Sequence, residues 1–297
     1  MLALRCRQRK GRHGTGSTKA YNVDFGSGPE FFGELVQKAQ QGARRSGTQS
    51  IERAMLMMRE LANRGRFGWG LWDLAARCGL SRATTHRILA CLVRERLVQQ
   101  RGSDRHYLPG PLVFELSLAM PAYAEFQAAC RAPLTRLSKR FGALTILHLR
   151  SANDWVCAAH AGPLVYVGAG LEVGTRRPLL STAGGAAILI ALDGAEARAT
   201  IDQNLVQLEH LGKARLERLQ KMIERSVTLG YAFNQSESTD GVHAFGLALR
   251  DPAGKVFGAL ALSGHADDFP ATRANEVIAV VREEVAHIEA QVRRIFQ

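Results

Sequence analysis

The apolar positions between Leu71 and Leu92 predict two short helices. Leu71, Leu74 and Ala75 are spaced for one face of the first helix. Gly79 is placed to end that helix in a left-handed conformation, and Ser81 stands where the N-cap of the second belongs. The second helix carries one apolar stripe, which is formed by Thr85, Ile88, Leu89 and Leu92.

A compact β-hairpin is predicted directly after these helices. Residues 97–100 and 105–108 have the pattern of short strands, and residues 102–104 form the connection between them. Before the helices, Ile51–Asn63 carries enough apolar residues to form another helix. Phe67 and Trp69 follow it in a turn, where we expect them to pack locally.

Three helices followed by a hairpin have the layout of a winged helix-turn-helix, which places one helix in the DNA major groove. The exposed face of this second helix is basic, as DNA contact requires. Its candidate DNA-binding residues are Arg82, Ala83, His86 and Arg87, with Thr84 at the margin. Arg82 lies in the first turn, where a cation opposes the helix dipole, and a phosphate or a guanine edge would explain that choice. A solvated basic face is the alternative interpretation.

Two further arginines, Arg101 and Arg105, flank the hairpin turn. We expect them to reach backbone phosphates or the minor groove, where contacts add affinity rather than sequence readout.

From Pro111 onward the pattern predicts a second domain of mixed helices and strands. A linker helix is expected to bend near Pro121 and to end before Pro133, and residues 132–141 form the next helix. Strands are predicted over residues 143–150, 154–161, 164–169, 231–235, 244–250 and 255–263, and helices over residues 180–192, 216–229 and 272–296. Antiparallel strands with helices packed on one side give an α+β fold class.

The expected division is a basic disordered tail over 1–46, a DNA-binding domain over 47–110, a linker helix over 111–131 and a second domain over 132–297. For the tail, a misassigned start codon is an alternative interpretation.

Net charge and cysteine usage limit the classes of function that the sequence allows. The 297 residues carry a formal net charge of +12, which favours a polyanionic partner such as nucleic acid. No apolar run approaches the ~18 residues of a membrane span, and no secretory signal is evident, so we expect a cytoplasmic, nucleoid-associated protein. The five cysteines are odd in number and lack paired spacings, so no metal site and no cofactor is predicted.

The segment Leu179–Gly185 is a candidate ligand site. Hydroxyls and two glycines begin a helix here, which leaves N–H groups open at the positive end of the helix dipole and suits a carboxylate. The alternative is a tightly packed helix start where glycine avoids a clash.

Several ordered motifs resemble the IclR family of bacterial transcriptional regulators, from about Thr48 to the C-terminus. They are Ser50–Ala54, Leu74-Ala75, Gly79–Ser81, Thr84–Leu89, Tyr107-Leu108, Gly110, Gly174–Leu179, Thr182–Gly185, Gly230–Ala232 and Leu260–Gly264. The resemblance implies a winged helix-turn-helix followed by a GAF-like effector-binding domain. It also implies a ligand-responsive regulator on a palindromic operator, dimers formed through the N-terminal unit, and pairing of dimers into tetramers.

The resemblance further implies an effector pocket. Its implied residues are Ala183, Gly184, Asn234, Ala244, Ala261 and Ser263, with Tyr166 and Ala169 from the preceding loop. Asn234 stands where the family commonly has aspartate, Ala244 where it has cysteine, and Ala261 where it has serine. Fewer polar groups favour an aromatic or longer aliphatic acid over a small keto acid, and the segment is similar to activators of hydroxyphenylpropionate-type catabolism.

Two other function classes are considered. A serine hydrolase would use Ser181, but no Gly-x-Ser-x-Gly elbow surrounds it, so we expect no enzyme. A metal or redox sensor would use His148 and Cys157, which a two-residue turn pairs across a hairpin, or Cys6; two ligands are an incomplete zinc site.

Overall fold

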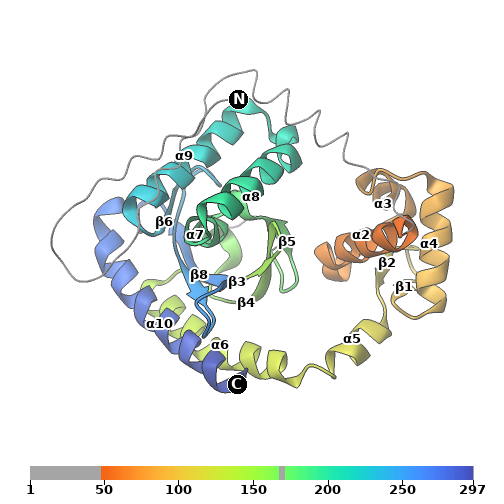
Figure 1. Ribbon diagram of the computed structural model, residues 1–297, viewed down its shortest axis with the longest axis horizontal. Helices are drawn as coiled ribbons and strands as arrows, with labels where there is room; N and C mark the ends of the chain where they lie inside the picture. The colour runs from red at the N-terminus through yellow and green to blue at the C-terminus, as the bar shows by residue number, and fades with distance from the viewer. Residues whose placement is uncertain (1–47, 167–170, 297) are drawn as a thin grey trace.

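The computed structural model describes residues 48–166 and 171–296, which form a small N-terminal unit, two connecting helices and a larger C-terminal domain (Figure 1). The predicted tail, Cys6 and Ala169 lie outside the described residues.

The N-terminal unit contains the predicted winged helix-turn-helix. Its elements are α2 (Gln49–Asn63), η1 (Gly65–Phe67), α3 (Leu71–Arg77), α4 (Arg82–Arg94), β1 (Val98–Gln100) and β2 (Tyr107–Pro109). Met57, Leu61, Leu74 and Leu89 are fully buried between the three helices. Gly79 has φ 61°, the left-handed conformation predicted for the end of α3.

The hairpin differs from its prediction at the second strand. Arg105 has φ 62° and belongs to the turn, so β2 begins only at Tyr107. The prediction for Phe67 was wrong: its side chain is 51% exposed. Trp69 does pack locally, with its Nε1 donating to the carbonyl oxygen of Glu60 at 2.7 Å.

Two helices, α5 (Pro111–Ser117) and α6 (Pro121–Phe141), connect the N-terminal unit to the C-terminal domain. Pro121 starts α6, close to the predicted bend. The prediction that a helix ends before Pro133 was wrong, because Pro133 lies buried inside α6. Proline removes one backbone hydrogen bond there. Burial of Phe126, Cys130 and Leu134 against the C-terminal domain keeps the helix continuous across the predicted boundary at 131/132.

A six-stranded antiparallel sheet forms the centre of the C-terminal domain, with strand order β5-β4-β3-β8-β7-β6. The strands are β3 (Leu144–Ser151), β4 (Asp154–Ala161), β5 (Arg176–Pro178), β6 (Ala232–Gln235), β7 (Val242–Arg250) and β8 (Val256–His265). The predicted hairpins β3–β4 and β7–β8 are both present.

Helices cover both faces of this sheet, so the prediction of helices on one side was wrong. The domain's helices are α7 (Ala183–Ala191), α8 (Gly194–Gln207), α9 (Lys213–Leu229) and α10 (Ala274–Ile295), with short η4 (Glu209–Leu211) and η5 (Ala271–Arg273). One core lies between the sheet and α7, α8 and α9, and the other between the sheet and the pair α6 and α10 (Figure 1). No described helix is both long enough and apolar enough to cross a membrane.

Three local differences occur near the candidate ligand segment. The predicted helix start at residue 180 is replaced by η3 (Leu179–Ser181), and α7 begins at Ala183. The predicted strand over 164–169 begins instead as η2 (Leu164–Tyr166). Helix α8 has no counterpart among the predictions, because its apolar positions make only a weak stripe.

Candidate functional site: a nucleic-acid interface and a cavity

Helix α4 is fixed by its cap and its buried stripe, which together decide which face points outward. The Ser81 Oγ accepts a hydrogen bond from the Thr84 N–H at 3.2 Å, as the N-cap prediction requires. Thr85, Leu89 and Leu92 are buried against the unit's core. The opposite face is therefore held toward solvent.

The predicted DNA-binding residues lie on this outward face. Arg82, Ala83, His86 and Arg87 are exposed, and Thr84 is half-buried and accepts a hydrogen bond from the Ser81 hydroxyl at 2.9 Å. Neither Arg82 nor Arg87 has an ion pair with any described residue. The Arg82 guanidinium stacks over the ring of Trp72, which is 55% exposed on α3. Sequence reasoning missed Trp72.

The two arginines that flank the hairpin turn, Arg101 and Arg105, differ in their contacts. Arg101 donates to Asp104 Oδ1 at 2.9 Å and to the carbonyl oxygens of Arg66 and Phe67 at 2.7 and 3.0 Å. This hydrogen bonding holds the pKa of the Asp104 carboxyl well below its usual range. Arg101 thus ties the hairpin turn to η1, while Arg105 lies exposed at the tip and forms no ion pair with a described acid.

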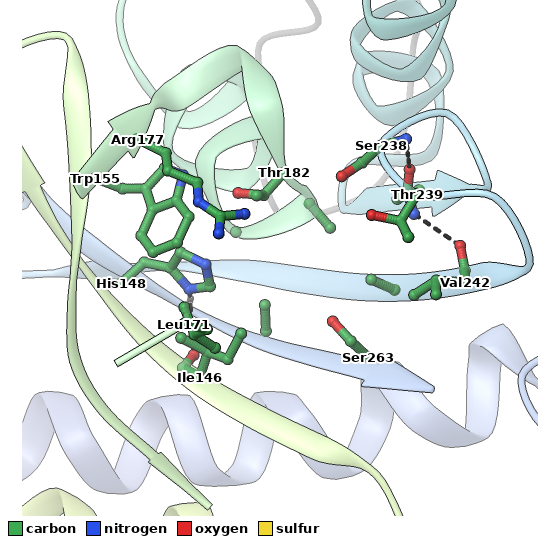
Figure 2. Close-up of a pocket in the computed structure, with 15 residues that line it drawn as sticks. Ile146, His148, Trp155, Leu171, Arg177, Thr182, Ser238, Thr239, Val242 and Ser263 are labelled. Carbon is green, nitrogen blue, oxygen red and sulfur yellow. Dashed lines mark hydrogen bonds between the residues drawn. The ribbon is translucent and has the colours of Figure 1, made fainter. Parts of the chain in front are cut away.

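A second candidate site is a cavity between the sheet and the N-terminus of α7. Its volume is about 30 Å³, room for one or two water molecules. Its lining residues are Ile146, His148, Trp155, Leu171, Arg177, Thr182, Ala183, Gly184, Asn234, Ser238, Thr239, Val242, Ala244, Ala261 and Ser263 (Figure 2).

Six of the eight residues expected to contact an effector line this cavity. They are Ala183, Gly184, Asn234, Ala244, Ala261 and Ser263. Tyr166 lies in η2 and is not among the lining residues. Asn234 makes two hydrogen bonds: its Nδ2 donates to the Val242 carbonyl oxygen at 2.9 Å, and its Oδ1 accepts from the Ser238 N–H at 2.8 Å.

The two glycines at the start of α7 are closely packed, as the alternative interpretation expects, and carboxylate binding there stays a prediction. A Cβ on Gly184 would collide with the His148 ring, and one on Gly185 with the Leu179 carbonyl, so close packing requires glycine. The Thr182 Oγ1 caps α7 by accepting from the Gly185 N–H at 3.1 Å. The N–H groups of Ala183 and Gly184 donate to no group among the described residues, and they remain available at the positive end of α7.

Sequence reasoning assigned no role in the cavity to His148, Trp155 or Arg177. Trp155 and Arg177 are directly opposite each other on β4 and β5, which places both on the α7 face of the sheet. His148 stacks edge-on against Trp155 with ring centroids 4.4 Å apart. Burial lowers the pKa of His148 to about 4, so the ring is neutral at pH 7. Strand alternation is the signal that finds these residues once the strand pairing is known.

The described residues offer no support for a metal or redox sensor at His148 and Cys157, or for a serine hydrolase at Ser181. His148 and Cys157 are paired as predicted, but no three potential metal ligands gather among the described residues. Burial raises the pKa of the Cys157 thiol to about 12, which keeps it protonated and unreactive. The Ser181 hydroxyl donates to the Pro178 carbonyl oxygen at 2.6 Å, and none of the described histidines is hydrogen-bonded to it.

Comparison with known families gives a match for both the N-terminal unit and the C-terminal domain. Residues 50–102 match the IclR helix-turn-helix domain, and residues 123–290 match the family described as bacterial transcriptional regulator IclR C-terminal. The second match covers more than half of the chain.

Individual relatives are similar in sequence to this chain over most of their length. The glycerol operon regulatory protein of Streptomyces griseus is 26% identical over 245 residues, 81% of this chain and 94% of the relative. The transcriptional repressor AllR of Escherichia coli is 25% identical over 233 residues, 78% of this chain and 84% of the relative.

Solved structures share the fold. An IclR transcriptional regulator from Silicibacter has a TM-score of 0.67 at 22% identity, covering 82% of this chain and 96% of that one. An IclR homolog from Microbacterium hydrocarbonoxydans, crystallised with 4-hydroxybenzoate, has a TM-score of 0.61 at 20% identity, covering 82% and 99%. With a helix-turn-helix unit and an effector-binding domain both in place, the chain belongs to the IclR family of bacterial transcriptional regulators.

Proposed function

We propose that this regulator reads an operator through the outward face of α4. The observation that carries this proposal is the exposed surface formed by Arg82, His86 and Arg87, whose two arginines form no ion pair with a described acid. Arginine binds guanine edges or phosphates in a bidentate manner, and Ala83 and Thr84 are small enough to let the helix approach the base pairs closely. Arg105 adds a phosphate contact from the hairpin tip, and Arg101 holds the hairpin in position for it.

The regulator acts as a dimer on an imperfect palindrome, with two α4 helices in successive major grooves about 34 Å apart. Exposed apolar side chains on α5 support association, since Phe114 is 67% and Leu116 55% exposed. Pairing of dimers through the effector-binding domains gives a tetramer. Binding to the chromosome makes the protein cytoplasmic and nucleoid-associated.

The effector binds in the cavity at the start of α7 and is a small carboxylic acid, either aromatic, such as an acid of the hydroxyphenylpropionate type, or longer aliphatic. The six predicted residues that line the cavity support this site. The Microbacterium hydrocarbonoxydans homolog binds an aromatic acid, 4-hydroxybenzoate. The ligand regulates by binding one arrangement of the protein better than another.

Selection from a library of random duplexes tests DNA recognition without knowledge of the operator. We expect enrichment of a palindromic sequence at moderate ionic strength, with half-site centres one helical turn apart. The selection is run with and without aromatic acids, since the ligand controls the binding state. If no sequence is enriched under either condition, the proposed function is wrong.

A further inference from the structure

Arg177 is a cation on the wall of the effector cavity. It lies on β5, opposite Trp155, and alternation along the strand places its side chain on the α7 side of the sheet. Figure 2 shows its guanidinium beside Trp155, pointing toward Thr182 and lying over His148. The guanidinium therefore faces the space in which an effector would bind.

No described acid neutralises this charge. Arg177 has no hydrogen bond and no ion pair with another described side chain, and none of the residues lining the cavity is acidic. The adjacent Arg176 is different, because it pairs with Asp154 at 3.3 Å. Burial lowers the pKa of Arg177, as expected for a partly desolvated cation, although arginine stays charged at pH 7.

A half-buried cation without an ion pair has lost part of its hydration and gained no partner in return, so Arg177 favours an anionic partner from outside the chain. Histidine does not compete for that partner, since His148 stays neutral beside Arg177. Other residues that line the same cavity also offer donors. They are Ala183 and Gly184, through their N–H groups at the positive end of α7, and Thr182, through its hydroxyl.

We propose that Arg177 is the charge partner of the effector, so that the cavity selects a carboxylate monoanion over the neutral analogue of the same shape. This inference rests on the proposed function, because it names the chemistry of the same site. Arg177 and the start of α7 hold the carboxylate. The apolar remainder of the ligand lies along Ile146, Leu171 and Ala261, which line the same cavity.

Matched pairs of acid and amide test this assignment by thermal shift and calorimetry on the full chain. The probes are benzoate, 4-hydroxybenzoate, 3-phenylpropionate and hexanoate, each beside its carboxamide. The variants are Arg177→Met, Arg177→Lys and the control Arg176→Met, which removes a cation from the same strand but on the opposite face. We expect at least one acid to stabilise the wild type and its amide to bind at least tenfold more weakly.

Arg177→Met should lose at least tenfold in affinity for that acid, Arg177→Lys should recover part of it, and Arg176→Met should keep it. A second readout needs no ligand. Without added acid, Arg177→Met should raise the Tm, because it removes an unpaired, half-buried charge, whereas Arg176→Met should lower it by breaking the pair with Asp154.

The inference is overturned if no acid stabilises the wild type more than Arg177→Met, or if acids and amides bind equally. Equal binding of acids and amides that also changes DNA affinity would leave the effector site standing and remove only the charge assignment. If no probe binds to the cavity and no probe alters DNA binding, both the charge assignment to Arg177 and the proposed effector site are wrong.

Discussion

The side-chain oxygen of Asn63 accepts a hydrogen bond at 2.9 Å from the backbone N–H of Arg176. Asn63 ends α2 of the DNA-binding unit, and Arg176 begins β5, the strand whose Arg177 lines the cavity at the start of α7. An exposed ion pair between Arg66 and Glu172 at 2.9 Å lies nearby. The same short segment therefore contacts the cavity on one side and the DNA-binding unit on the other.

Asn63→Ala is expected to reduce the effect of ligand on DNA binding while leaving both separate affinities near wild type. Loss of one contact along such a route changes coupling by about 0.5–2 kcal/mol. Fluorescence anisotropy on a selected operator, with and without a stabilising acid, measures the ratio of affinities. Arg66→Gln is the matched comparison, since its exposed ion pair should contribute little. An unchanged ratio in Asn63→Ala would exclude this contact as a route.

Arg87→Ala is expected to weaken operator binding by about 1–3 kcal/mol while leaving binding to random duplex largely unchanged, because bidentate base contacts are specific. Arg94→Ala is the control on the same helix, where the arginine pairs with Glu95 in the last turn. Equal losses on operator and random duplex would mean that Arg87 contacts only phosphates.

Gly184→Ala is expected to destabilise the protein by about 1–3 kcal/mol, since the added methyl group would meet the His148 ring. In a His148→Ala background the same substitution should cost much less. Gly194→Ala is the control, because a Cβ there meets open space at the start of α8. Urea denaturation of the wild type, the two single variants and the double variant measures the energetic coupling between positions 184 and 148. Equal costs in both backgrounds would show that His148 is not what excludes a side chain at position 184.

His148 should make stability depend on pH. Its pKa falls from 6.5 to about 4 on folding, because burial disfavours the charged ring and the Arg177 cation adds to that effect. The unfolded chain therefore binds the proton first, and about 3 kcal/mol of stability is lost progressively as the pH falls from 6.5 toward 4. His148→Gln should flatten this part of the profile, and His210→Gln at an exposed position should not. Superimposable profiles for wild type and His148→Gln would contradict the assignment.

The sequence was sufficient for elements whose local signals agree. Helix α4 was predictable because a cap at Ser81 and an apolar stripe ending at Leu92 indicate the same helix. Pro133 misled the prediction because proline is a local signal, whereas the burial of its neighbours in α6 depends on strands far along the chain.

Some residues of the cavity could be predicted from the sequence and others could not. Ala183, Gly184 and Ser263 were accessible through resemblance to a family. Arg177 was not, because its role depends on which strand it pairs with and on the absence of an acid nearby. Those facts come from pairing and packing rather than from the motif in which Arg177 lies.

The cavity at the start of α7 has a volume of only about 30 Å³, well below that of an aromatic acid. An effector of that size would have to displace the residues that line the cavity, and this displacement would lower its affinity. We therefore expect substitutions that enlarge the cavity to raise ligand affinity while lowering the stability of the folded chain.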